Sequence, residues 1–193
     1  MIELNKVSVK YGNTQVLNDF SMVVNKGEHS ALMGSSGAGK TTVLQLIANL
    51  RSPDSGKVLC HTKKIAYMFQ EPRLVPWLTA AENVNLVLGD SEKSLPEAVK
   101  WLKLVGLEDA IDKYPAELSG GMQQRTALAR ALAYNADVLL LDEPLSALDE
   151  EMADSILSMI KEYTNDKTVI LVTHNSAHAK QFAETIYILK SRS

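Results

Sequence analysis

The chain has 193 residues, of which 46% are hydrophobic, which is enough apolar material for one compact domain with its own core. Its formal net charge of −3 argues against a nucleic-acid-binding protein, which normally carries a basic face. The single cysteine excludes an intrachain disulfide, the N-terminus lacks the features of a signal peptide, and no apolar run approaches the ~20 residues that span a bilayer.

The N-terminal part of the chain predicts an antiparallel pair of strands. Apolar and polar residues alternate over Ile2–Val9 and Val16–Val24, and Gly12 and Asn13 supply turn chemistry between them. The next expected elements are a strand, a helix and a strand: His29–Met33, Thr41–Leu50 and Lys64–Phe69.

The rest of the chain predicts helices that alternate with strands. From about residue 79 to 113 apolar residues recur at helical spacing without a strand, which favours a helical subdomain over about residues 72–134. The later helices and strands are expected, alternating in this order, at Met122–Ala133, Asp137–Leu141, Glu151–Tyr163, Thr168–Val172, Ser176–Phe182 and Thr185–Leu189. This pattern indicates an α/β fold with a mainly parallel sheet, in which ligands bind at the carboxyl ends of the strands.

A phosphate-binding loop follows the first strand of this alternating part. The sequence fits G-x-x-x-x-G-K-[ST] between a strand and a helix, so that backbone N–H groups face the phosphates of a nucleotide. Lys40 would contact the β- and γ-phosphates, Thr41 would offer its hydroxyl to Mg²⁺, and Thr42 would reach a phosphate oxygen. The predicted phosphate-binding residues are Gly34, Ser35, Ser36, Gly37, Ala38, Gly39, Lys40, Thr41 and Thr42.

Two acidic residues stand where an apolar strand leaves the sheet. Asp142 would hold Mg²⁺, directly or through water, and Glu143 would act as the general base toward the attacking water. An Asp-Glu pair alone could be a solvated turn, but downstream of a phosphate loop it is typical of a nucleoside triphosphatase.

The segment Leu118–Arg125, LSGGMQQR, is a second anion-binding element. Its Ser-Gly-Gly run opens a helix, where bare N–H groups present roughly half a positive charge. One chain therefore has two anion-binding helix ends. A nucleotide shared between two chains needs only one such helix end from each of them. We expect two copies to close over shared ATP.

With these motifs in their order, nearly the whole chain resembles the nucleotide-binding subunit of an ATP-binding cassette (ABC) transporter. The resemblance implies a P-loop NTPase core with an N-terminal antiparallel β subdomain and an inserted helical subdomain, all within one domain over residues 1–193. It implies ATP and Mg²⁺ as ligands and a second ABC subunit as partner, with a homodimer expected.

The resemblance also assigns roles to residues outside the phosphate loop. Ser119, Gly120 and Gly121 would contact the γ-phosphate of the ATP held by the partner. Asp149 closes a segment, Ser146–Asp149, that resembles the family's D-loop, which couples the two sites. The remaining assignments are the γ-phosphate contact His174, the Mg²⁺ and water contact Gln70, and the adenine-stacking residue Tyr11. The family often has aspartate where this chain has Asn175.

The segment Gln70–Thr79 is expected to contact transmembrane permease subunits at the cytoplasmic face of the membrane. The amino-acid sequence of this segment resembles that of ATP-binding subunits of importers in the nitrate, sulfonate, taurine and pyrimidine-precursor group. Such importers act with an extracytoplasmic solute-binding protein. Trp77 could form an apolar docking patch with Leu74 and Leu78, or it could anchor the helical subdomain to the core. The chain ends 19 residues after His174, so no C-terminal regulatory domain is expected.

Three other readings compete with the importer subunit. An exporter subunit would share every catalytic residue and differ only in its partner. A soluble ABC ATPase of repair or translation usually has a coiled-coil insertion or two cassettes. An ordinary phosphate-loop kinase or GTPase would leave Leu118–Arg125, Gln70 and His174 without a role.

Overall fold

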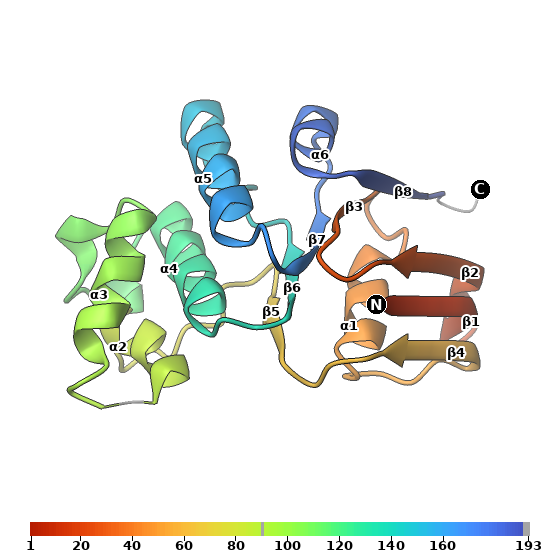
Figure 1. The fold of residues 1–193 in the computed structure, drawn as a ribbon, viewed down its shortest axis with the longest axis horizontal. Helices are drawn as coiled ribbons and strands as arrows, with labels where there is room; N and C mark the ends of the chain where they lie inside the picture. The colour runs from red at the N-terminus through yellow and green to blue at the C-terminus, as the bar shows by residue number, and fades with distance from the viewer. Residues whose placement is uncertain (90, 191–193) are drawn as a thin grey trace.

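The computed structural model describes residues 1–89 and 91–190, which form two sheets flanked by helices (Figure 1). The strands are β1 (Ile2–Tyr11), β2 (Thr14–Val24), β3 (His29–Gly34), β4 (Ser55–Cys60), β5 (Ile65–Met68), β6 (Val138–Asp142), β7 (Thr168–Val172) and β8 (Thr185–Leu189). The α-helices are α1 (Lys40–Ile47), α2 (Ala80–Asn85), α3 (Leu95–Leu104), α4 (Gly120–Ala133), α5 (Glu150–Tyr163) and α6 (Ser176–Phe182). Short 3₁₀ turns cover Leu86–Leu88, Glu108–Ala110 and Pro115–Glu117.

The parallel sheet has the strand order β5-β6-β7-β3-β8. All of its neighbouring strands are parallel, as the alternation of strands and helices predicts. β6 and β7 are buried along their whole length, because both faces of the sheet are covered. The α/β fold class is therefore confirmed, and the carboxyl ends of β3, β6 and β7 meet at one edge.

The antiparallel sheet has the order β2-β1-β4, and its third strand was not predicted. In Ser55–Cys60 the outward residues include Lys57 and Leu59, so polar and apolar side chains do not alternate cleanly. The strand is defined by pairing with β1, where Ile2 lies opposite Cys60 and Leu4 opposite Val58. Because these pairing partners are distant in the sequence, the strand leaves no local signal.

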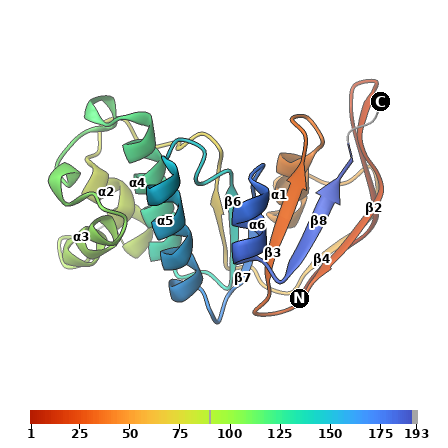
Figure 2. The same cartoon turned by 90° about the horizontal axis from the view of Figure 1, so that it is seen from above.

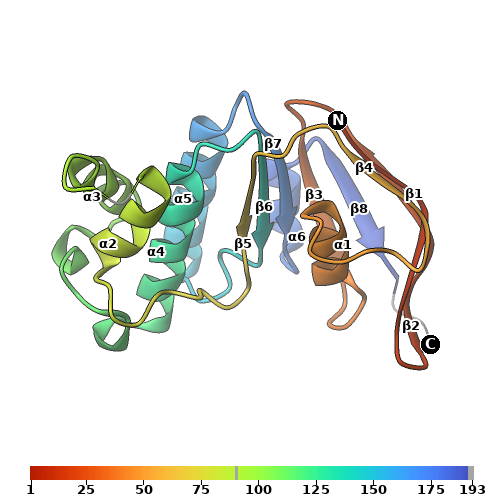
Figure 3. The same ribbon diagram turned by 90° about the horizontal axis from the view of Figure 1, so that it is seen from below.

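Two hydrophobic cores lie on opposite faces of the parallel sheet. α1 lies between the parallel and antiparallel sheets, and α4 and α5 lie beyond the opposite face (Figures 2 and 3). Successive strand residues point to opposite faces, so Leu140 packs in the core around α1 whereas Leu139 and Leu141 pack toward α4 and α5.

Several helix boundaries differ from the expected ones. α1 ends at Ile47 rather than Leu50, because the chain turns away through Asn49, which has a left-handed φ of 55°. α4 begins at Gly120 rather than Met122, with Ser119 as its N-cap. The helices α2, α3 and α4 fall within residues 72–134, which we retain as our proposal for the helical subdomain.

Among the described residues, no helix combines the length and the apolar character needed to cross a bilayer.

Candidate nucleotide-binding site

The phosphate loop joins β3 to α1 and depends on a left-handed residue. Gly39, the N-cap of α1, has φ 98°. A Cβ atom there would lie 2.8 Å from Cγ1 of Val16, so a side chain would be both strained and obstructed. Lys40 folds back over the loop, and its Nζ donates to the carbonyls of Gly34 at 2.8 Å and Ser35 at 3.0 Å. An anion in the loop would draw this ammonium away from the carbonyls.

Asp142 ends β6 beside the first turn of α1. Its Oδ2 accepts a hydrogen bond from Oγ1 of Thr41 at 2.8 Å, and the residue is only 2% exposed. Burial raises the pKa of Asp142 above the ordinary value of 3.8, and the nearby Glu143 charge acts in the same direction. A carboxylate that is costly to ionise in the free protein gains from a bound cation.

Glu143 is held in an unusual backbone conformation, with φ 53°. Its carbonyl accepts from Nε2 of Gln124 at 2.6 Å and from Oγ of Ser146 at 3.0 Å, and its N–H donates to the carbonyl of Val172 at 3.1 Å. Such strain at a non-glycine residue persists only where neighbouring groups hold it. The side chain reaches His174, with Oε2 2.9 Å from Nδ1.

These residues line one cleft of about 520 Å³ at the carboxyl edge of the parallel sheet. Its lining includes the expected residues Tyr11, Gly34, Ser35, Ser36, Gly37, Gly39, Lys40, Thr41, Thr42, Gln70, Asp142, Glu143 and His174. Ala38 is buried behind the loop and is 5% exposed, so it would contribute its backbone N–H only.

Tyr11 lines the cleft and is 45% exposed. The guanidinium of Arg51 lies 4.0 Å from the centre of its ring, which covers one face. The hydroxyl lies 3.5 Å from Oγ1 of Thr42 and 3.4 Å from Oε1 of Gln45. An aromatic ring held in this way can offer its other face to a base. Thr42 is 6% exposed, so its hydroxyl points toward the hydroxyl of Tyr11 rather than to open solvent.

The segment Leu118–Arg125, called the signature segment below, and Asp149 are not among the residues that line this cleft. Ser119 accepts from the N–H of Met122 at 3.3 Å, and Asp149 accepts from the N–H of Met152 at 2.9 Å, so each side chain caps its helix. Ser119, Gly120 and Asp149 are exposed. The structure thus brings the phosphate loop, acidic pair, Gln70 and His174 together, and leaves Ser119 and Gly120 at the N-terminus of α4 exposed outside the cleft.

Three residues of the site were not singled out by sequence. Val16 lines the cleft from β2 and contacts the loop at Gly39. Gln124 and Ser146 hold the carbonyl of Glu143. Gln124 belongs to the signature segment, and its 3% exposure shows that it faces inward along α4. The position of Gln124 within Leu118–Arg125 was the available sequence signal. Only its contact with the carbonyl of Glu143 explains what the side chain does.

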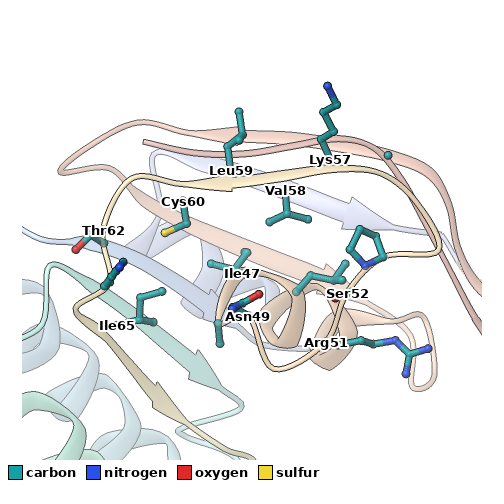
Figure 4. A pocket seen from close by; sticks show the side chains of 15 residues that line it. Ile47, Asn49, Arg51, Ser52, Lys57, Val58, Leu59, Cys60, Thr62 and Ile65 are labelled. Carbon is teal, nitrogen blue, oxygen red and sulfur yellow. The ribbon is translucent and has the colours of Figure 1, made fainter.

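A second hollow of about 680 Å³ lies between α1 and β4 (Figure 4). Val58 and Cys60 point into it, whereas Lys57 and Leu59 point to the other side of the strand (Figure 4). Arg51 on its border is already engaged with the carbonyl of Lys10 and the ring of Tyr11. The lining of the hollow mixes apolar side chains with polar ones such as Asn49, Ser52 and Thr62, and none of the described residues that line it carries a carboxylate, unlike the lining of the cleft.

A phosphate loop, a buried strand-end carboxylate and a parallel sheet define a nucleotide-binding α/β protein of the phosphate-loop class. Residues 17–146 match the family described as "ABC transporter". The aliphatic sulfonates import ATP-binding protein SsuB of Escherichia coli K12 is 41% identical over 97% of this chain and 76% of its own length. SsuB 1 of Shouchella clausii is 39% identical over 100% of the chain and 78% of its own length.

Solved structures give the same answer. A dimeric ATP-binding cassette in a post-hydrolysis state, bound to ADP and Pi, has a TM-score of 0.90 and 33% identity and covers 100% of this chain and 97% of its own. A dimeric bacterial ABC transporter cassette has a TM-score of 0.90 and 35% identity, with 98% and 94% covered. The chain belongs to the ABC transporter family, and it is an ATP-binding cassette with ATPase function.

Proposed function

We propose that this cassette powers solute import by hydrolysing ATP at sites shared between two copies of the chain. The observation that carries this proposal is the separation of two anion-binding helix ends. The N-terminus of α1 faces the chain's own cleft, whereas Ser119 and Gly120 at the start of α4 are exposed and outside it. A partner's nucleotide can occupy the second end only in a dimer.

Within each cleft, the residues take complementary parts in phosphoryl transfer. Tyr11 stacks on adenine, and the loop N–H groups with Lys40 bind the phosphates. Glu143 accepts a proton from the attacking water, and His174 holds the γ-phosphate and Glu143 in register, supported by their 2.9 Å contact. Gln70 orients the water from the end of β5. Asp149 acts on the partner site through the segment it closes.

The oxygens at the inner end of the cleft suit Mg²⁺. Thr41 and Asp142 offer a hydroxyl and a carboxylate 2.8 Å apart, with Gln70 lining the same cleft, and hard oxygen ligands are those that Mg²⁺ prefers. Among the described residues there is no group of three His, Cys, Asp or Glu side chains that could hold a metal alone. Phosphate oxygens and water would therefore complete the set. When bound, Mg²⁺ would neutralise charge on the phosphates.

The docking segment, residues 70–79, is shaped to meet a permease subunit. Trp77 is 75% exposed, which favours docking over an internal anchor, while Leu74 packs against the core. Asn83 holds the segment, since its Oδ1 accepts from the N–H of Val75 at 2.7 Å and its Nδ2 donates to three carbonyls of the segment. Arg130 donates to the carbonyls of Pro72 and Arg73 at 2.9 and 3.1 Å. An exposed indole on a segment held in this way suits an apolar groove of a partner.

Import is supported by the relatives, which are named as aliphatic sulfonate import subunits. We propose a small organic anion of this class as the solute, delivered by an extracytoplasmic binding protein. The cassette would then act at the cytoplasmic face of the membrane, held there by its permease.

The shared-site mechanism is tested with purified Glu143→Gln protein, sized by light scattering with and without ATP and Mg²⁺. We expect a shift from monomer to dimer with ATP. The control is Glu143→Gln combined with Ser119→Arg, which should bind ATP and stay monomeric, because an arginine in the exposed helix end obstructs the partner's γ-phosphate. Equal dimerisation of the double variant would refute the role of the signature.

The direction of transport is tested with the cassette and its permease in proteoliposomes. Uptake of a sulfonate that requires both ATP on the cassette side and the binding protein on the other supports import. Efflux without any binding protein would identify an exporter.

A further inference from the structure

Tyr67, in β5, lies against the carboxylate of Asp142. β5 pairs in parallel with β6, with Tyr67 opposite Leu140, and Asp142 is two residues beyond Leu140 on the same face. A tyrosine is long enough to reach this diagonal neighbour, and its hydroxyl lies 3.5 Å from Oδ2 of Asp142. Tyr67 is partly buried against the core around α1 and does not line the nucleotide cleft.

The phenol acts on the same oxygen as Thr41. Both hydroxyls donate to Oδ2, so neither of these bonds uses Oδ1. A phenol has an ordinary pKa of about 10, so the hydroxyl of Tyr67 is protonated at neutral pH and is a donor. Together the two donors contact Oδ2 of a buried carboxylate from two elements, α1 and β5.

Tyr67 is also connected to the docking segment by a continuous stack. Its ring centre lies 4.1 Å from that of Phe69, with an interplanar angle of 24°. The guanidinium of Arg73 lies 3.9 Å from the centre of the Phe69 ring. Arg73 has a left-handed φ of 47°, and Arg130 on α4 binds its carbonyl. A backbone held in this conformation is a place where a docking partner can act.

We propose that Tyr67 is a positioning residue for Asp142, and that the stack Tyr67–Phe69–Arg73 carries the state of the docking segment to this carboxylate. This inference rests on the proposed function, in which Asp142 binds Mg²⁺ and residues 70–79 meet the permease. It gives the docking segment a second route to the site beside Gln70, which directly follows Phe69.

The test is the affinity for ATP, measured by titration calorimetry in EDTA and in Mg²⁺, and expressed as the ratio of the two dissociation constants. Tyr67→Phe keeps the stack and removes only the hydroxyl. We expect the gain in affinity from Mg²⁺ to fall about 3- to 10-fold, as for loss of one hydrogen bond of ordinary strength, because the 3.5 Å contact is long for a bond to a carboxylate. The affinity in EDTA and the melting temperature should be unchanged. A ratio equal to that of the unaltered protein, or equal weakening in both conditions, would overturn the proposal.

The route to the docking segment is tested by a double-mutant cycle with Arg73→Leu. In the protein with Tyr67, Arg73→Leu should lower the ratio of the two dissociation constants. In the Tyr67→Phe protein it should leave this ratio unchanged, because the coupling between Arg73 and Asp142 passes through the Tyr67 hydroxyl. Lys64→Leu is the matched control, since Lys64 lies over the ring of Tyr134 at 5.8 Å, outside the stack. Additive effects, or an equal effect of Lys64→Leu, would exclude the route. Failure of the unaltered protein to bind ATP in EDTA would instead refute the proposed function.

Discussion

Nδ1 of His174 lies 2.9 Å from Oε2 of Glu143, although the two residues follow different strands, β7 and β6. β6 and β7 are neighbours in the sheet, and the N–H of Glu143 donates to the carbonyl of Val172 at the end of β7. The glutamate side chain is 12% exposed and the histidine 71%. The histidine therefore covers the glutamate from the solvent side and sets the direction of its carboxylate.

The first prediction is that His174→Ala lowers the ATPase rate by about 10²-fold or more while ATP still binds, because a general base without its orienting contact loses most of its benefit. The rate is measured as phosphate release at saturating ATP, beside nucleotide binding. His61→Ala is the control, since His61 is exposed and outside the cleft. A rate within twofold of the unaltered protein would show that the contact has no catalytic role.

The second prediction compares the two signature glycines. A Cβ atom on Gly121 would lie 2.9 Å from the backbone oxygen of Ala147, whereas one on Gly120 would meet nothing within 4 Å. Gly121→Ala should destabilise the isolated protein by about 1–3 kcal/mol, the usual cost of overpacking. Gly120→Ala should leave stability unchanged and weaken only ATP-driven dimerisation. Denaturant melts and light scattering separate these effects, and equal stability of both variants would contradict the expected contact.

The site was more predictable from the sequence than the sheet that flanks it. The phosphate loop and the acidic pair carry their chemistry in consecutive residues, so each motif alone predicts that its residues lie at the carboxyl end of a strand. The 2.8 Å contact of Thr41 with Asp142 is seen only in the structure. β4 was missed because its pairing with β1 is set by residues distant in the sequence. Likewise, the contacts of Gln124 with Glu143 and of Tyr67 with Asp142 depend on how α4 and β5 pack beside β6.

The choice between the two readings of Trp77 also required the structure. The sequence shows prolines and apolar residues in the docking segment, a pattern that suits both a buried anchor and an exposed patch. The exposure of Trp77 argues against the buried anchor, because Asn83, which is 0% exposed, holds the segment while the indole faces solvent. Docking of a partner on Trp77 stays a proposal. An asparagine in an amphipathic helix gives no sign of this role.

The third prediction concerns pH. Burial raises the pKa of Asp142 above 3.8 in the folded protein, so the folded state holds this proton more tightly than the unfolded chain. The protonated carboxyl of Asp142 therefore contributes to the free energy of unfolding at low pH. This contribution is lost as the pH rises through the raised pKa of the folded state. Asp142→Asn should equal the unaltered protein in acid and become more stable than it toward neutral pH, in the absence of nucleotide and Mg²⁺. Stability is measured by urea unfolding across the pH range.

Glu28 provides a control of opposite sign. Burial alone would raise its pKa, but hydrogen bonds from Asn25, Ser30 and Thr185 bring the pKa below the ordinary value of 4.5. The ionised carboxylate of Glu28 therefore contributes to the free energy of unfolding at neutral pH. This contribution is lost as the pH falls through the lowered pKa of the folded state. Glu28→Gln should therefore be less stable than the unaltered protein at neutral pH, with the difference shrinking in acid. Parallel pH profiles for the two variants would rule out the assigned environments.

The last prediction separates the shape of the docking segment from the stability of α2. Asn83 and Asn85 are both buried on this helix, but Asn83 holds residues of the docking segment, whereas Asn85 binds Ser91 and Ser94. Asn83→Ala and Asn85→Ala should each destabilise the protein by about 1–3 kcal/mol, because buried partners lose their hydrogen bonds.

Their effects on the permease should differ. Asn83→Ala frees the segment that presents Trp77, so permease-stimulated ATPase activity should fall together with co-sedimentation with permease vesicles. Asn85→Ala should keep both. Trp77→Ala should keep stability, since the indole is 75% exposed, and lose stimulation. If Trp77→Ala retained full stimulation of its ATPase activity by the permease, the permease would have to dock elsewhere. The stack from Arg73 to Tyr67 would then have no docked partner whose state it could carry to Asp142.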